Sequence, residues 1–137
     1  MNKERTLLMI KPDATRKNYI GSIINLLEEK GLTLIAIKSG KFTEKEAKEF
    51  YKEHEGRVFF EELIDYICSG LIVAICLQGE NIINEVREII GATDPKKAEE
   101  GTIRKIFGED INSNAVHASD SLNASHREIS FFFKDLV

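Results

Sequence analysis

The stretch LIVAICL at residues 71–77 decides how this chain folds, because every one of its residues is apolar. A short run that is apolar on both faces is typical of a strand in the interior of a sheet. It is also the longest apolar candidate in the chain, far short of the ~20 residues that cross a bilayer. We therefore expect a central strand here, in a protein without a membrane-spanning segment.

Two more strands and a helix are predicted upstream of this stretch. Residues 6–10 (TLLMI) form an apolar run that Lys11-Pro12 stops, and residues 32–37 (LTLIAI) form another. Between them, isoleucine and leucine recur at helical spacing over residues 19–30, and Gly31 follows where a C-terminal cap belongs. The chain thus begins with a strand, a helix and a second strand.

A helical insert separates the second strand from the central one. Thr43 and Glu46 have the spacing of a capping box, which predicts a polar helix that runs to about His54. Residues 59–68 carry apolar side chains on one side of a second predicted helix, and Ser69-Gly70 closes it. This pair of helices lies outside any simple alternation of strand and helix.

Beyond the central strand, residues 81–90 predict a helix that Gly91 closes, and a long polar stretch then runs to about Arg127. Residues 128–133 (EISFFF) predict a last strand. Without the insert, the order is β-α-β-β-α-β, the ferredoxin-like unit, in which helices pack on one face of a four-stranded antiparallel sheet. We expect one α+β domain over residues 1–137, with a long loop that carries function, as loops of this length usually do.

The composition is that of an ordinary globular domain, with 42% hydrophobic and 31% charged residues among 137. A net charge of −4 disfavours specific binding of nucleic acid through a basic face, but a locally positive pocket could still hold a small anion. The first residues are too polar for a signal peptide. Cys68 and Cys76 have neither metal-site nor redox-motif spacing, so we expect free thiols in a cytoplasmic protein.

The long loop contains NAVHASDS at residues 114–121. Small residues flank His117 and leave its ring accessible, and polar side chains nearby could orient it. A histidine in a polar loop is by itself most often a surface residue. His54 and His126 have nothing comparable around them, and we interpret both as ordinary surface residues.

NAVHASDS resembles the active-site signature N-x-x-H-G-S-D-S of the nucleoside diphosphate kinases. Other blocks resemble parts of the same family in its order and spacing: TLLMIKPDA, FYKEHEGRVFFEEL at 50–63, REIIGATDP at 87–95, GTIRKIF at 101–107 and REISFFF at 127–133. The resemblance thus covers nearly the whole chain, and the family's fold is the ferredoxin-like one. No glycine-rich phosphate loop of the Walker or Rossmann kind is present in the sequence.

The resemblance implies a ping-pong reaction, in which the γ-phosphoryl group of a nucleoside triphosphate, typically ATP, passes to a histidine and then to a nucleoside diphosphate. His117 matches the nucleophile, Glu128 the carboxylate that holds its ring, and Ser119 the hydroxyl that supports this carboxylate. Imidazole suits the task because it is largely neutral near pH 7 and forms a reactive phosphoramidate. The products would be GTP, CTP, UTP and the deoxynucleoside triphosphates.

The phosphate ligands implied by the family are Arg87 and Arg104, with Thr93 as a hydroxyl donor. Arginine suits this role because its planar fork meets two phosphate oxygens at once. The sequence shows no cluster of carboxylates spaced to hold a metal ion, so we expect no protein metal site. Mg²⁺ should arrive on the nucleotide phosphates instead.

The remaining implied site residues contact the nucleoside or the nucleophile. Lys11 and Asn114 match the pair that holds the sugar hydroxyls, with Lys11 also near the transferred phosphate. Tyr51 matches a hydroxyl that assists transfer, and Phe59 matches the aromatic ring that stacks on the base, with Leu63 beside it. Because stacking reads the flat face of a base, broad base tolerance is expected.

Four positions depart from the family pattern. Ala118 stands where glycine is usual, and alanine would cost roughly 1 kcal/mol there if the backbone needs a positive φ. Val58, Leu71 and Glu100 each stand where proline is common. Glu100 belongs to a loop that in this family often contacts neighbouring subunits, so its effect would fall on assembly.

Three hypotheses follow. The chain is an active nucleoside diphosphate kinase, a catalytically weak member that binds nucleotides or acts through partners, or an unrelated ferredoxin-like binding module. The family resemblance also implies a homo-oligomer, a tetramer or a hexamer built from dimers, and the sequence does not choose between them. Nucleoside tri- and diphosphates are the expected partners.

Overall fold

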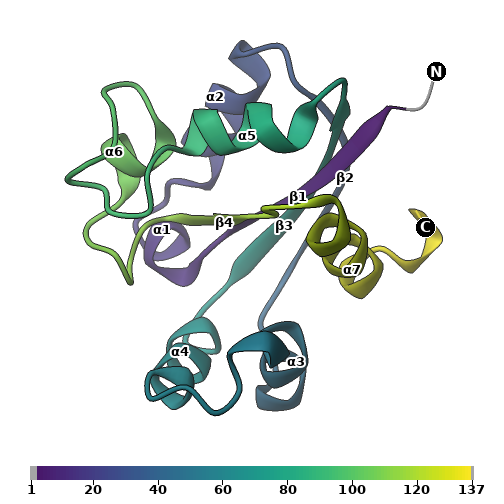
Figure 1. The fold of residues 1–137 in the computed structure, drawn as a ribbon. Coiled ribbons are helices and arrows are strands. Elements are labelled where there is room, and N and C mark those ends of the chain that lie inside the picture. The colour runs from purple at the N-terminus through teal and green to yellow at the C-terminus, as the bar shows by residue number, and fades with distance from the viewer. Residues whose placement is uncertain (1–2, 137) are drawn as a thin grey trace.

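The computed structural model describes residues 3–136 and contains one four-stranded sheet. Its strands are β1 (Glu4–Ile10), β2 (Thr33–Gly40), β3 (Ile72–Gly79) and β4 (Val116–Ala118), in the spatial order β2-β3-β1-β4 (Figure 1). All three neighbouring pairs are antiparallel. The apolar stretch quoted first therefore forms an interior strand, as predicted.

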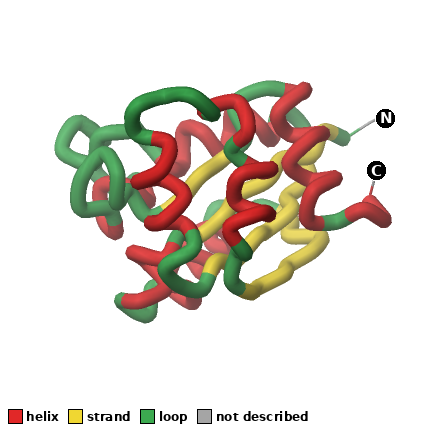
Figure 2. The backbone as a smooth tube through the Cα atoms, turned by 90° about the horizontal axis from the view of Figure 1, so that it is seen from below, coloured by secondary structure: helices red, strands yellow, loops and turns green. Residues whose placement is uncertain are grey.

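Helices cover both faces of this sheet. They are α1 (Pro12–Arg16), α2 (Ile20–Glu29), α3 (Glu44–Phe50), α4 (Phe60–Ile67), α5 (Ile82–Ile90), α6 (Ile103–Phe107) and α7 (Leu122–Phe132), with short 3₁₀ turns η1 (Lys52–His54) and η2 (Lys134–Leu136). In Figure 1, α2 and α5 lie above the sheet and α3 and α4 below it. Figure 2 shows, from below, helices lying across the strands.

The two faces hold two separate apolar clusters. On one face, Leu8, Val73 and Ile75 pack with the buried side chains of α2 and α5. This is the arrangement expected of the ferredoxin-like core β1-α2-β2-β3-α5-β4. On the other face, Met9 and Ala74 pack with α3, α4 and α7. The helical insert thus explains why the central strand is apolar on both sides.

The predicted capping box is present at the start of the insert. The Thr43 hydroxyl accepts a hydrogen bond from the Glu46 N–H at 3.1 Å, and the Glu46 carboxylate accepts one from the Thr43 N–H at 2.9 Å. The helix is shorter than predicted, since α3 ends at Phe50 and a 3₁₀ turn continues to His54. Tyr51 lies at this junction.

The prediction of a last strand over residues 128–133 is wrong. This segment belongs to α7, which Ser121 caps by accepting a hydrogen bond from the Ala124 N–H at 3.1 Å. The buried residues of α7 are Ser125, Glu128 and Ile129, at helical spacing, whereas the run of phenylalanines conceals that period. The fourth strand is instead the three-residue β4, inside the predicted loop, where it pairs with β1.

The interval between residues 91 and 121 carries structure of its own, as its length predicts. It contains α6 and β4, so His117 lies on an edge strand rather than in a loop. Cys68 and Cys76 are both free thiols. In the part of the chain that the structure describes, none of the helices has the length and apolar character needed to span a bilayer.

Candidate active site

The pairing of β4 with the buried strand β1 sets the position of His117, which lies opposite Met9. The rings of Phe50 and Tyr51 face the imidazole edge-on, with centroids 5.6 and 6.3 Å away. The Nε2 atom lies 2.9 Å from the Glu128 carboxylate, and 27% of the His117 side chain remains exposed. One ring nitrogen is therefore held while the ring keeps access to solvent.

Glu128 is almost completely buried, so its carboxylate needs hydrogen-bond donors from the protein. The Ser119 hydroxyl donates to the same oxygen that contacts His117, at 2.8 Å. The Leu7 N–H in turn donates to the Ser119 hydroxyl at 3.3 Å. Because α7 is a helix, Glu128 can point toward the sheet together with Ser125 and Ile129.

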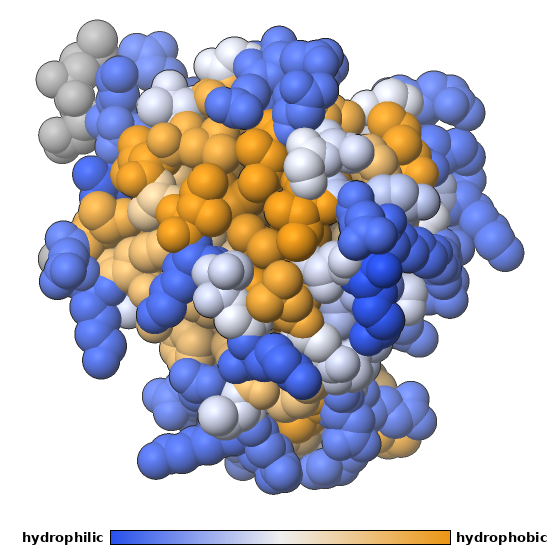
Figure 3. All heavy atoms as spheres, turned by 180° about the vertical axis from the view of Figure 1, so that it is seen from behind, coloured by the Kyte–Doolittle hydropathy of each residue, from blue (hydrophilic) through white to orange (hydrophobic). Residues whose placement is uncertain are grey.

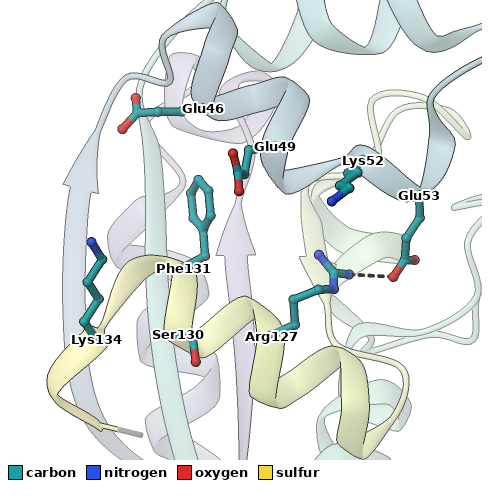
Figure 4. A pocket seen from close by; sticks show the side chains of 8 residues that line it. All are labelled: Glu46, Glu49, Lys52, Glu53, Arg127, Ser130, Phe131 and Lys134. Carbon is teal, nitrogen blue, oxygen red and sulfur yellow. Dashed lines mark ion pairs between the residues drawn. The ribbon is translucent and has the colours of Figure 1, made fainter.

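Arg127 connects this carboxylate to the helical insert. Its guanidinium lies 3.0 Å from the Glu53 carboxylate and 3.5 Å from the second oxygen of Glu128, and it donates to the Phe50 carbonyl at 3.2 Å. Figure 4 shows Arg127 reaching from α7 toward Glu53. The groove here, about 880 Å³, is lined by Glu46, Glu49, Lys52, Glu53, Arg127, Ser130, Phe131 and Lys134.

Lys11 and Asn114, predicted as a pair, lie within hydrogen-bond distance of each other. The Lys11 ammonium donates to the Asn114 side-chain oxygen at 2.7 Å, and the Asn114 amide donates to the Thr93 carbonyl at 3.0 Å. The pKa of Lys11 is lowered to about 8, mainly by burial, while the Asp13 carboxylate raises it and the charge of the nearby Arg104 lowers it. The surroundings of Lys11 therefore destabilise its charged form.

The two predicted phosphate ligands attach to the backbone on either side of the histidine. Arg104 donates to the Val116 carbonyl at 3.0 Å, and Arg87 donates to the Ala118 carbonyl at 3.3 Å. Burial and, to a smaller extent, the charge of Arg87 together lower the pKa of Arg104 to about 10. Two guanidinium groups that destabilise each other favour an anion between them. A groove beside them is lined by Arg87, Glu88, Gly91, Ala92, Thr93, Lys97, Glu99 and Thr102.

The aromatic residues near the site differ in their exposure. Phe60 is buried in the core, whereas 47% of Phe59 is exposed, and Leu63 is half-buried. Tyr51 is buried, and burial followed by the negative charge of Glu128 raises the pKa of its hydroxyl above the usual range. Tyr51 therefore stays protonated and can serve only as a neutral hydrogen-bonding group.

Several residues at this site carry no signal in the sequence. His54, interpreted above as an ordinary surface residue, has its ring 6.2 Å from that of Tyr51 and 5.9 Å from that of Phe59. Its buried Nδ1 atom has no hydrogen-bond partner among the described residues. Asp13 and Tyr66 form a partly buried hydrogen bond, and the Lys11 ammonium lies over the Tyr66 ring. The contact of Asp13 with Tyr66 joins segments 53 positions apart in the sequence, which spacing arguments do not reach.

The departures from the family pattern have small structural consequences. Ala118 lies in β4 and is not among the residues with positive φ, so the strain considered for it does not arise. The left-handed residue in this segment is Ala115, at φ 74°. Val58, Leu71 and Glu100 are all exposed, so they displace no packing. No group of three or more His, Cys, Asp or Glu in residues 3–136 could hold a metal ion.

Comparison with known proteins agrees with this fold. The family model for nucleoside diphosphate kinase matches residues 4–136. The nucleoside diphosphate kinase of Persephonella marina is 49% identical over 136 residues, which are 99% of this chain and 97% of that protein. That of Helicobacter pylori is 48% identical over 131 residues, 96% of each chain.

Two solved structures are similar over nearly the whole chain. The nucleoside diphosphate kinase of Aquifex aeolicus superposes with a TM-score of 0.94 at 43% identity and covers 98% of both chains. The enzyme of Halobacterium salinarum in complex with CDP superposes with a TM-score of 0.93 at 40% identity, over 98% of this chain and 90% of that one. A ferredoxin-like enzyme that transfers phosphoryl groups and binds nucleotides is the class defined by these matches.

This chain belongs to the nucleoside diphosphate kinase family. It is therefore a transferase of nucleotide metabolism, and the hypothesis of an unrelated binding module is excluded.

Proposed function

We propose that this protein moves the γ-phosphoryl group of a nucleoside triphosphate to a nucleoside diphosphate through a phosphohistidine on His117. The observation that carries the proposal is the buried Glu128 carboxylate 2.9 Å from the Nε2 atom of that ring. A carboxylate at this distance favours a proton on Nε2, which leaves the lone pair of Nδ1 free to attack.

The chemistry then runs in two matching half-reactions. In the first, a bond forms between Nδ1 and the γ-phosphorus while the bond from that phosphorus to the bridging oxygen breaks, and the diphosphate leaves with the electron pair. The imidazole gains positive charge as this bond forms, and Glu128 stabilises it. In the second half-reaction a terminal oxygen of another diphosphate attacks the same phosphorus, and Nδ1 departs as neutral imidazole.

Positive charge is the main requirement of phosphoryl transfer, because the transferring group is anionic throughout. Arg87, Arg104 and Lys11 would supply it, with hydroxyl donors from Thr93 and Tyr51. The expected phosphate ligands are cations rather than carboxylates, so Mg²⁺ would be held by the nucleotide phosphates and most of its own waters. When bound, this ion neutralises part of the phosphate charge.

The exposed ring of Phe59 is suited to stack on a base, with Leu63 beside it and Lys11 and Asn114 toward the sugar. Stacking discriminates weakly between bases, which supports broad tolerance of purines, pyrimidines and both kinds of sugar. The Halobacterium salinarum relative in complex with CDP fits this breadth. One domain over residues 1–137 would carry the whole activity, and the free thiols Cys68 and Cys76 fit a cytoplasmic protein.

The test is the intact mass of the protein after incubation with ATP and Mg²⁺, followed by addition of a different nucleoside diphosphate. We expect the mass of one phosphoryl group to be gained and then lost. His117→Ala should gain nothing, whereas His126→Ala, a change at an exposed histidine of α7, should behave as wild type. Wild-type protein that binds ATP and never gains the group would contradict the proposal and support the nucleotide-binding, catalytically weak hypothesis.

Assembly into dimers, and from these into a tetramer or a hexamer, is part of the same proposal. Strand β2 forms one edge of the sheet, with the short strand β4 at the other, and 54% of Ile37 on β2 is exposed. Figure 3 shows apolar side chains gathered on the side of the molecule formed by β2 and α2. An open apolar edge strand is a surface that proteins normally cover. Light scattering of wild type and Ile37→Lys tests this, and a monomeric wild type would refute it.

A further inference from the structure

Ala115 has a backbone conformation that alanine rarely adopts. Its φ is 74°, and the other non-glycine residues with positive φ in residues 3–136 are asparagines, which tolerate this region better. The Val116 N–H donates to the Asn114 carbonyl at 2.9 Å, which closes a tight turn around Ala115. Such a turn persists only where its surroundings hold it firmly.

Both backbone groups of Ala115 are held by the segment that follows β1. The Ala115 N–H donates to one carboxylate oxygen of Asp13 at 3.0 Å, and the Ala115 carbonyl accepts from the Lys11 N–H at 2.8 Å. Asp13 is 6% exposed, so it depends on the protein for its donors. Its other oxygen accepts from the Tyr66 hydroxyl, which also accepts from the Asp13 N–H at 3.3 Å.

The held turn lies between residues of the candidate site. Asn114, which accepts the hydrogen bond from the Lys11 ammonium, comes immediately before Ala115. His117 follows it by two residues on β4, so a change at the turn would move both. The Lys11 ammonium also lies 5.6 Å from the centre of the Tyr66 ring. Tyr66 belongs to α4, so this contact joins the helical insert to the segment that follows β1.

We propose that Asp13 and Tyr66 are positioning residues of the phosphoryl-transfer site, which hold the left-handed turn at Ala115 and thereby set the places of Asn114 and His117. Neither side chain needs to touch the substrate. The inference rests on the proposed phosphohistidine, and it adds that the reactive geometry depends on a tyrosine of α4.

The test is the rate of His117 phosphorylation at saturating ATP, measured by rapid quench. Tyr66→Phe removes only the hydroxyl, and we expect the rate to fall between about 10- and 100-fold, the range that a displacement of about 1 Å produces. Tyr19→Phe is the matched control, because the Tyr19 ring packs against Phe107 in the other apolar cluster. It should leave the rate unchanged.

A second substitution separates positioning from simple loss of stability. Glycine adopts a positive φ without strain, so Ala115→Gly added to Tyr66→Phe should restore most of the lost rate. A merely structural role would lower the melting temperature and leave the rate of folded protein intact. A wild-type rate in Tyr66→Phe, or a lowered rate that Ala115→Gly does not restore, would overturn the inference. Failure of the phosphohistidine itself would show separately, in wild type.

Discussion

Replacing Glu128 by glutamine tests whether this carboxylate sets which ring nitrogen of His117 carries the proton. The change keeps the shape of the side chain and removes its charge. If charge alone matters, a charge-assisted hydrogen bond becomes a neutral one, which is worth about 1–1.5 kcal/mol or roughly ten-fold in rate. The structure predicts a larger loss, because the second oxygen of Glu128 lies 3.5 Å from the Arg127 guanidinium.

A glutamine at this position must choose which way its amide points. With the amide nitrogen toward Arg127, two donors face each other, so the amide should turn its nitrogen toward His117 instead. It would then donate to Nε2, and the ring proton would move to Nδ1, where it blocks attack. A histidine held in the wrong tautomer costs on the order of 10⁴-fold in serine proteases, and we expect a loss of about 10³- to 10⁴-fold in phosphorylation rate here.

The assay is the single-turnover formation of phosphohistidine in rapid quench, with nucleotide affinity measured separately. Arg127→Met added to Glu128→Gln removes the donor that orients the glutamine amide nitrogen toward His117. His117 should therefore be phosphorylated faster in the double variant than in Glu128→Gln alone. Arg127→Met by itself is the control for lost contacts to Glu53 and Phe50. A Glu128→Gln rate within about ten-fold of wild type would refute the tautomer argument, as would a double variant no faster than the single one.

Three further predictions concern charge, stacking and the backbone. Because burial lowers the pKa of Lys11 to about 8, its positive charge is present below that pH and lost above it. We therefore expect kcat/KM to fall as the pH rises through about 8. A pH profile that stays flat to pH 10 would contradict a role of the Lys11 charge in phosphoryl transfer. Phe59→Ala should weaken the binding of all nucleotides alike, by about 1–3 kcal/mol in titration calorimetry. Phe60→Ala should instead lower the free energy of unfolding by about 3–5 kcal/mol. Ala118→Gly should bring no gain in rate and cost about 0.5–1 kcal/mol in denaturant unfolding; a faster enzyme would show that strain exists there after all.

The sequence predicts most of this fold because long elements carry a clear pattern. β1, β2 and β3 are runs of apolar residues, and α2 and α5 show helical periodicity, so their boundaries fall within a few residues of those expected. The failure lies at residues 128–133, where consecutive phenylalanines satisfy a helix and a strand equally well. The three residues of β4 are too few to form a detectable pattern. They form a strand through their pairing with β1, which is a contact distant in the sequence.

The candidate site, like the fold, could be predicted from the sequence only in part. Residues in the signature NAVHASDS were predicted by resemblance, and the structure brings both Ser119 and His117 within hydrogen-bond distance of Glu128. The supporting residues were missed, because Tyr66 meets Asp13 across 53 positions of the chain. A contact of that kind depends on how the insert packs against the sheet, which no local pattern contains.

The attachment of Arg104 to the Val116 carbonyl has a consequence for how this protein can vary. The Arg104 guanidinium would have two roles, since it bonds the backbone next to His117 and would also bind the incoming phosphate. Lysine carries the same charge but lacks the planar fork that lets separate N–H groups point in separate directions. A lysine at position 104 could bond to the Val116 carbonyl or to the phosphate, but not to both at once. This position therefore tolerates substitution less well than its charge alone suggests, and a loss of activity on Arg104→Lys would come with a loosened edge strand.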